Sequence, residues 1–221
     1  SYVTRTPKMT DPIRDVRREY KYATLSRTDV AKDPLDQFRR WIGEAETAEI
    51  QDVTAMALAT SDAQGQPTVR IVLLKGFDET GFSWFSDGGS EKGLALAANP
   101  RAELLFHWRE LDRQIRIRGS VVSLSAVEAD TYFYSRPLAS QLAAATSQQS
   151  RPVASRDALE QRYKELATEH TDSAPRPPAW GGFKLQPQAY EFWQGREGRL
   201  HDRLQFKRDA GQQWQVQRLQ P

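Results

Sequence analysis

The residues best suited to chemistry lie near the C-terminal end of the sequence. Arg199, His201 and Arg203 are spaced two apart, and they follow Trp193. If this segment is extended, all three side chains leave the same face of the backbone. Such a surface suits a planar anionic ligand, because Arg grips phosphate through a fork of donors and an aromatic ring stacks on a flat heterocycle. On spacing alone, a solvated basic edge strand is the slightly better interpretation, since exposed Arg is common.

Further basic and hydroxyl residues occur at expected strand ends and loops. Arg70 and Lys75 bracket an apolar run, and a spacing of five places them on opposite faces of a regular strand. They share a ligand only if the strand bends or the ligand spans its end. The Gly-rich residues 88–93 are a weak signal for an anion site at a helix start, and residues 132–137 and 147–150 are rich in donors. Taken singly, each segment is more typical of structure than of a site.

Composition narrows the class of protein. The chain has 221 residues, and its 31 basic against 29 acidic residues give a net charge of +2, too balanced to indicate nucleic-acid binding. The absence of Cys excludes disulfides, thiolate metal sites and a Cys nucleophile, and fits a cytoplasmic protein. No apolar run has the length of a membrane span, and the N-terminus lacks the apolar core of a signal peptide.

Several common sites are not indicated. The sequence contains no dinucleotide-binding glycine motif, no phosphate-binding P-loop and no nucleophile elbow. His107, His170 and His201 lie far apart and show no ligand spacing, so no metal is expected.

Hydrophobic periodicity and turn residues predict the elements that carry these residues. Helices are expected at 11–20, 34–45, 90–99, 125–135, 138–145 and 155–170. Strands are expected at 54–60, 68–77, 82–86, 101–108, 113–123, 182–193, 201–208 and 214–219, with a turn at 180–182. About six antiparallel strands with helices at their edges predict a barrel-like α+β fold. We expect one domain over 1–221 with a flexible segment at 1–10, the Pro-rich stretch 171–179 being a stiff connector.

Taken together, the segments resemble the pyridoxamine 5′-phosphate oxidase family, FMN enzymes of vitamin B6 metabolism. The resemblance rests on Arg17 to Tyr20, Arg70 to Lys75, Ser90 to Lys92, Arg113-Gln114, Tyr132 to Pro137 with Ser140-Gln141, Gln149-Ser150, Trp180 to Gly182, and Glu191 to Arg203. These stretches follow the family's order over residues 14–221, and the ending from Glu191 is the most specific.

The resemblance implies an FMN-binding split β-barrel homodimer with FMN at the subunit interface. By matching position, the FMN side comprises Arg70, Ile71, Val72, Leu73, Leu74, Lys75, Phe85, Ser86, Lys92, Gln114, Gln149, Ser150, Trp193 and Arg203. The substrate side comprises Lys75, Tyr132, Arg136, Ser140, Arg199, Leu200 and His201, with Arg17, Arg18, Glu19 and Tyr20 closing over the site. Arg199 and His201 are the implied catalytic residues, and the chemistry involves no metal.

The implied reaction oxidises pyridoxamine 5′-phosphate and pyridoxine 5′-phosphate to pyridoxal 5′-phosphate. O₂ is the acceptor, and H₂O₂ is released, with NH₃ from the amine. Two alternatives stay open: an FMN oxidase of the phenazine-biosynthesis type, and a split-barrel protein that binds flavin or pyridoxal phosphate without turnover. Lys75 and the Tyr132, Arg136 and Ser140 pattern favour the B6 substrate over the first.

The sequence departs from the family's pattern at a few positions. Glu91 stands where the family usually has Arg, and it repels the FMN phosphate if it points at it, which predicts weaker FMN retention. Ser86 replaces a common Thr and keeps the hydroxyl. Differences at 138–139 and 143–145 affect details of the substrate pocket.

Overall fold

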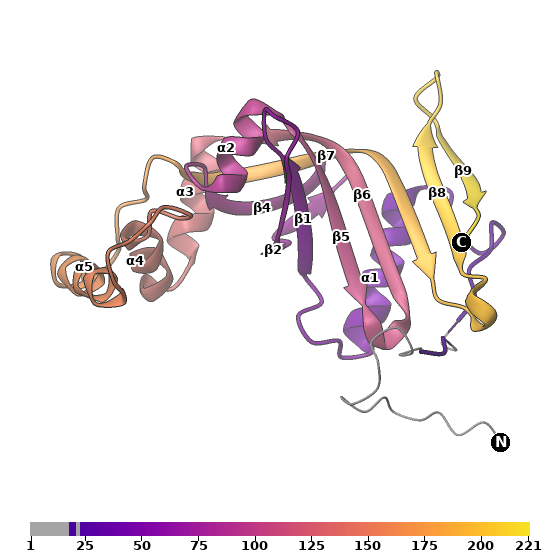
Figure 1. Ribbon diagram of the computed structural model, residues 1–221, viewed down its shortest axis with the longest axis horizontal. Coiled ribbons are helices and arrows are strands. Elements are labelled where there is room, and N and C mark those ends of the chain that lie inside the picture. The colour runs from indigo at the N-terminus through magenta and orange to yellow at the C-terminus, as the bar shows by residue number, and fades with distance from the viewer. Residues whose placement is uncertain (1–17, 21–22) are drawn as a thin grey trace. The chain divides into compact units, whose positions relative to one another are not determined.

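The computed structural model describes residues 18–20 and 23–221 (Figure 1). The chain forms two compact units. The larger unit holds residues 54–105 and 117–188. The smaller unit holds the described residues up to 53, together with 106–116 and 189–221.

The strands of both units belong to one nine-stranded sheet. Its order is β2-β1-β5-β6-β7-β4-β3, with β8 paired to β7 and β9 paired to β8. The strands are β1 (Ala55–Ser61), β2 (Pro67–Leu73), β3 (Gly76–Asp78), β4 (Gly81–Asp87), β5 (Arg101–Trp108), β6 (Arg113–Ser123), β7 (Trp180–Gln194), β8 (Asp202–Arg208) and β9 (Trp214–Leu219). Figure 1 shows β8 and β9 as a hairpin at the C-terminal end. The α+β split-barrel class predicted from the sequence is confirmed. The nine strands correspond to the eight expected strand segments, one of which, 68–77, divides into β2 and β3.

Local sequence signals explain where the helices begin. The helices are α1 (Pro34–Thr47), α2 (Glu91–Ala98), α3 (Ala126–Ser135), α4 (Leu138–Thr146) and α5 (Arg156–Glu169). Asp33 caps α1 by accepting a hydrogen bond from the Leu35 N–H at 2.7 Å, and Pro34 follows at the first helical position. Ser125 and Glu128 form a reciprocal capping box at the start of α3. The five predicted helices from residue 34 onward are therefore confirmed within a few residues.

Each unit has its own apolar core. In the larger unit, Leu58, Phe82, Trp84 and Leu185 are fully buried. In the smaller unit, the α1 residue Phe38 is fully buried and packs edge-on against Phe106, with ring centroids 5.2 Å apart. Helix α5, expected to be amphipathic, has no buried residue among those described.

The segment 68–77, expected as one strand, divides into two. Strand β2 ends at Leu73, after which the Leu74 N–H donates to the Thr54 carbonyl and the Lys75 N–H donates to the Ser83 carbonyl. The chain thus changes its hydrogen-bonding partner between Leu74 and Lys75, and β3 pairs with β4 instead of β1. The prediction that Arg70 and Lys75 lie on opposite faces of one strand therefore does not apply. Arg70 lies in β2, whereas Lys75 follows the end of β2 and its N–H bonds to β4.

Two N-terminal expectations fall largely outside the described residues. The flexible segment 1–10 lies there entirely, and so does most of the helix expected at 11–20, whose last three residues, 18–20, are not helical. No helix among the described residues is long and apolar enough to cross a membrane. The expectation of a single domain stays a prediction.

Candidate functional site

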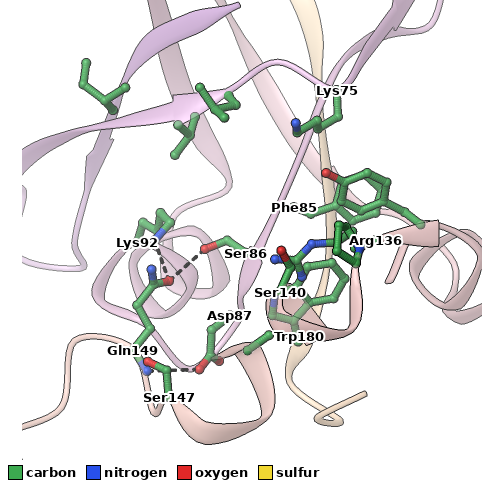
Figure 2. Close-up of a pocket in the computed structure, with 16 residues that line it drawn as sticks. Lys75, Phe85, Ser86, Asp87, Lys92, Arg136, Ser140, Ser147, Gln149 and Trp180 are labelled. Carbon is green, nitrogen blue, oxygen red and sulfur yellow. Dashed lines mark hydrogen bonds between the residues drawn. The ribbon is translucent and has the colours of Figure 1, made fainter. Parts of the chain in front are cut away.

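The larger unit contains a pocket of about 590 Å³ (Figure 2). The end of β2, strand β4, the first turn of α2, the segment from α3 into α4, and the start of β7 line it. Eleven predicted site residues lie on its wall: Ile71, Val72, Leu73, Lys75, Phe85, Ser86, Lys92, Tyr132, Arg136, Ser140 and Gln149. Residues far apart in sequence are thereby brought to one cavity.

One part of the pocket wall is built around Gln149. Its side-chain oxygen accepts hydrogen bonds from Lys92 Nζ at 2.8 Å and Ser86 Oγ at 3.0 Å (Figure 2). The carboxylate of Asp87 accepts from the Gln149 N–H at 3.3 Å, which holds the loop after α4 against β4. Burial and the nearby Arg70 guanidinium lower the pKa of Lys92. Lys92, Ser86 and Gln149 thus form a compact group that has the positive charge of Lys92 and hydrogen-bond donors able to turn toward a ligand.

A second group of donors is built around Arg136. Its Nη1 atom is buried and has no hydrogen-bond partner among the described residues. The guanidinium carbon lies 5.0 Å from the ring centroid of Trp180, within the range of a cation–π contact. Ser140 and Tyr132 line the same pocket, and Lys75 Nζ lies 5.9 Å from the Tyr132 ring centroid. A buried guanidinium nitrogen without an acceptor is costly, so this group is suited to an anionic ligand.

Three aromatic rings stack between strand and helix at this pocket. Phe85 lies 4.0 Å from Tyr132 and 5.7 Å from Trp180, measured between ring centroids. Gly182 pairs with Phe85 across β4 and β7, and a Cβ there would lie 2.8 Å from the Phe85 ring. The glycine is thus required for the close approach of β7. The turn expected at 180–182 is wrong, since these residues begin β7.

Arg70 lies in the same unit and does not line the pocket, unlike its neighbour Ile71. Its guanidinium pairs with the carboxylate of Glu91 at 2.8 Å. Two other predicted cofactor residues of this unit, Leu74 and Ser150, also do not line the pocket. Leu74 is buried, and Ser150 is exposed with a φ of 70°.

In the smaller unit, a cluster of rings surrounds His201. Its ring centroid lies 4.8 Å from that of Trp193 and 5.0 Å from that of Tyr20. Tyr20 approaches closely because Gly195 has no side chain, and a Cβ there would lie 2.5 Å from the Tyr20 ring. Arg18 holds the segment in place by pairing with Asp112 at 2.6 Å. Of the expected closing residues, Tyr20 lies beside His201, and the Arg18 guanidinium lies 5.4 Å from the Tyr20 ring centroid. Arg17 is outside the described residues.

The backbone fixes the orientation of the His201 ring. The Arg196 N–H donates to His201 Nδ1 at 3.0 Å, so the neutral ring carries its proton on Nε2. Burial and the neighbouring Arg199 charge lower the pKa of His201. Within this cluster, neutral His201 is a hydrogen-bond donor through Nε2.

The condition that would place Arg199, His201 and Arg203 on one face, an extended segment, is not met. Glu197–Arg199 form a 3₁₀ turn, in which Gly198 and Arg199 have φ values of 65° and 62°. Strand β8 begins only at Asp202. Arg203 donates to Glu191 through Nε at 3.1 Å and Nη2 at 2.9 Å, which raises its pKa, while exposed Arg199 and Leu200 lie in the turn.

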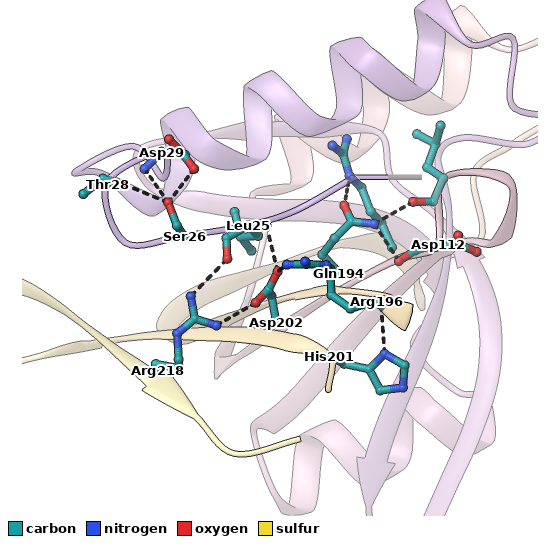
Figure 3. A network of polar contacts seen from close by, with 12 residues as sticks. Leu25, Ser26, Thr28, Asp29, Asp112, Gln194, Arg196, His201, Asp202 and Arg218 are labelled. Atoms are coloured by element: carbon teal, nitrogen blue, oxygen red, sulfur yellow. Dashed lines mark hydrogen bonds and ion pairs between the residues drawn. The ribbon is translucent and has the colours of Figure 1, made fainter. Parts of the chain in front are cut away.

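Two residues missed by the sequence reasoning hold this turn. The Asp202 carboxylate accepts from Arg196 at 2.9 Å, Arg218 at 2.7 Å and the Leu25 N–H at 2.9 Å (Figure 3). Burial alone would raise the pKa of Asp202, but these hydrogen bonds lower it overall. The signal available in the sequence for this contact was the pair of opposite charges, Arg196 and Asp202, in one short segment. In the larger unit, the pocket residues that were not predicted as site residues are Asp87, Pro137, Ala144, Ser147 and Trp180, of which Ala144 belongs to the stretch 143–145 expected to affect the substrate pocket.

The predicted site residues thus fall into two groups, one in each unit. The larger unit holds the pocket, and the smaller unit holds Tyr20, Trp193, His201 and the nearby Arg199 and Arg203. Gln114 also lies in the smaller unit, on β6. Among the described residues, no group of three or more His, Cys, Asp or Glu side chains is placed to hold a metal ion.

Two solved structures have a fold similar to that of this chain. One is PhzG from Burkholderia lata 383, in complex with tetrahydrophenazine-1-carboxylic acid, with 32% identity and a TM-score of 0.83 over 88% of this chain and 95% of that one. Another is a pyridoxamine 5′-phosphate oxidase-related, FMN binding protein from Nostoc punctiforme, with 17% identity, a TM-score of 0.68 and coverage of 87% and 100%. The second likeness concerns the fold alone.

Sequence comparison extends over nearly the whole chain. The pyridoxine/pyridoxamine 5′-phosphate oxidase of Cupriavidus necator is 55% identical over 207 residues, which cover 94% of this chain and 98% of the relative. The protein of the same name from Bordetella pertussis is 49% identical over 209 residues, covering 95% and 99%. Residues 180–221 match the pyridoxine 5′-phosphate oxidase C-terminal dimerisation region. Since residues 42–170 also match the model described as pyridoxamine 5′-phosphate oxidase, the chain belongs to the pyridoxamine 5′-phosphate oxidase family.

Proposed function

We propose that this protein is an FMN-dependent oxidase that converts pyridoxamine 5′-phosphate and pyridoxine 5′-phosphate to pyridoxal 5′-phosphate. O₂ is the acceptor and H₂O₂ is released, and the amine substrate also consumes one water molecule and yields NH₃. The observation that carries the proposal is the pair of cationic donor groups around one pocket. Lys92 with Ser86 and Gln149 forms one group, and Arg136 with its neighbours forms the other.

The residues present fit both phosphorylated ligands. FMN and the B6 substrate each carry a phosphate, and each charge-assisted hydrogen bond contributes roughly 1.5–3 kcal/mol. Lys92, Ser86 and Gln149 would hold the cofactor phosphate, and Arg136, Ser140, Tyr132 and Lys75 the substrate phosphate. The unpartnered Nη1 of Arg136 gives this second assignment its support.

When bound, FMN supplies a ring that accepts a hydride equivalent from the substrate and passes electrons to O₂. The protein's own part is to bind, orient and exclude water. Arg199 and His201 are proposed to lie over the substrate ring, where neutral His201 donates a hydrogen bond through Nε2. Tyr20 packs edge-on against His201, with the two ring planes at 85°.

We further propose that two copies form the active assembly, with FMN at their interface. The match of residues 180–221 to a dimerisation region supports this assembly. So does an apolar stripe on β2, an end strand of the sheet order: Val69, Ile71 and Leu73 are 68%, 66% and 46% exposed. Since Ile71 and Leu73 also line the pocket, a second copy that covers the stripe would close the pocket wall.

A phenazine-type oxidase is the second candidate. The PhzG structure, in complex with a carboxylic acid, is 32% identical to this chain. A carboxylate offers fewer acceptor oxygens than a phosphate dianion. The Arg136 group, with Lys75, Tyr132 and Ser140 at the same pocket, favours the phosphorylated substrate.

Anaerobic mixing of FMN-loaded protein with pyridoxine 5′-phosphate tests the proposal. We expect the flavin absorbance near its visible maximum to bleach and to return when air is admitted. Bound ligand with no bleaching would support a binding protein without turnover. No binding of the B6 substrate, but bleaching with a reduced phenazine carboxylate, would support the second candidate.

A further inference from the structure

The Arg70 guanidinium is held by acceptors on both terminal nitrogens. Nη1 donates to Thr60 Oγ1 at 2.7 Å and to the Leu58 carbonyl at 3.2 Å. Nη2 donates to Thr68 Oγ1 at 2.6 Å and to Glu91 Oε1 at 2.8 Å. Acceptors on β1 and β2 hold the guanidinium in place, and Glu91 accepts the other hydrogen bond from Nη2.

Glu91 differs from the other acceptors of Arg70 in charge and in freedom. Its side chain is 63% exposed, whereas that of Arg70 is 19% exposed. It occupies the first position of α2, where the helix dipole favours an anion. A charged and solvent-accessible carboxylate can leave Arg70, while the β1 and β2 atoms cannot.

The same region is where an incoming phosphate would be drawn. Lys92 follows Glu91 directly and binds Gln149 at the pocket wall. Burial, and after it the nearby Arg70 charge, lower the pKa of Lys92. Arg70 does not line the pocket and is paired with Glu91, so a phosphate held at Lys92 can use the Arg70 charge only in competition with the Glu91 carboxylate.

We propose that Glu91 is an internal competitor of the FMN phosphate for Arg70, and that it weakens FMN binding through the phosphate alone. The inference rests on the proposed function, because it takes FMN as the ligand. In this proposal the weaker FMN binding depends on the ion pair between Arg70 and Glu91. Direct repulsion between Glu91 and the phosphate would not depend on that contact. FMN binds only when the carboxylate turns away to solvent or shares Arg70 with the phosphate.

The test compares FMN and riboflavin, which lacks the phosphate, by quenching of flavin fluorescence. We expect Glu91→Gln to lower the Kd for FMN about tenfold, equivalent to about 1.4 kcal/mol. Glu91→Ala, which removes the contact itself, should lower it at least as much. The Kd for riboflavin should stay the same in both variants. Glu79→Gln, an exposed carboxylate in the turn between β3 and β4, is the matched control and should change neither Kd.

A second measurement separates competition for Arg70 from through-space repulsion. In Arg70→Gln protein, the further change Glu91→Gln should improve FMN binding by less than threefold, since the contested cation is gone. A full tenfold gain in that background overturns the competition. Equal FMN Kd values for wild type and Glu91→Gln, or equal gains for riboflavin and FMN, overturn it as well.

The outcomes also separate this inference from the proposed function. If FMN binds and is reduced by pyridoxine 5′-phosphate in every variant while Glu91 has no effect, only the competition is wrong. If folded wild-type and variant proteins all fail to bind FMN, the proposed function is wrong and the inference falls with it.

Discussion

The main-chain N–H of Arg196 donates a 3.0 Å hydrogen bond to Nδ1 of His201. This bond fixes the neutral tautomer, because a donor faces Nδ1 and the ring proton must then be on Nε2. Asp202 binds the Arg196 side chain at 2.9 Å and so holds the donor in place. His201 is therefore set to donate toward a ligand, and protonation of the ring would break the bond from Arg196.

The titration of His201 should reflect this arrangement. Its pKa should lie below the ordinary value of 6.5, because burial and Arg199 disfavour the imidazolium. Arg199→Gln should raise the pKa toward 6.5 by removing the second of these causes. The chain has only three His residues, so NMR titration can assign His201 from the spectrum of His201→Asn. A wild-type pKa at or above 6.5, or no change in Arg199→Gln, would contradict this account.

Arg199 should affect turnover far more than cofactor content. We expect Arg199→Ala to lower kcat/KM by about 100-fold, the loss of roughly one charge-assisted interaction with the reacting substrate. FMN content should stay within about a factor of two, since the proposed cofactor phosphate is held by the larger unit. Arg27→Ala, exposed in the same unit, is the control. Unchanged turnover in Arg199→Ala would refute the assigned role.

Arg136 should act on the substrate phosphate. Arg136→Lys keeps the charge but loses the forked donors, so the KM for pyridoxine 5′-phosphate should rise by about 10- to 100-fold. The Kd for FMN should not change. Arg156→Lys on α5 alters an exposed Arg paired with Glu160 and should leave both constants as they are. A raised FMN Kd with an unchanged KM would place Arg136 at the cofactor instead.

Asp202 should contribute strongly to stability. Its side chain is 10% exposed and pairs with two arginines, so Asp202→Asn should lower the free energy of unfolding by about 3 kcal/mol. Asp36→Asn breaks an exposed pair and should cost less than about 1 kcal/mol. Urea unfolding at pH 7 measures both, and equal small losses would show that the Asp202 pairs are weak.

The pH dependence of the same contribution follows from the lowered pKa of Asp202. The unfolded carboxyl has a pKa near 3.8 and the folded one lies lower, so the stabilisation is complete above about pH 4. It is lost as the pH falls through the folded pKa. The difference in stability between wild type and Asp202→Asn should therefore shrink in acid.

Local signals in the sequence predicted the elements well. The capping residues Asp33 and Ser125 placed the starts of two helices, and the alternation in 113–123 placed β6. What failed depends on contacts made across the fold. The break after Leu73 arises because β2 pairs with β1 and β3 pairs with β4.

The site was predicted by resemblance more than by local pattern. Lys92 and Ser86 meet Gln149 from 57 and 63 residues away, a convergence that no spacing reveals. The left-handed φ of Arg199 also leaves no mark in its residue type. Glu91 could be identified as a departure from the family pattern, but its partner Arg70 required the structure.

The contacts of Leu25 have a consequence for how the chain folds as it is synthesised. Leu25 donates to Asp202 and accepts from Arg218, partners that are 177 and 193 residues later in the chain. The segment that enters α1 is therefore made early, yet it cannot make these bonds until residue 218 has left the ribosome. During translation the smaller unit cannot complete its contacts until β9 has been synthesised, whereas residues 54–105 and 117–188 can already pack together.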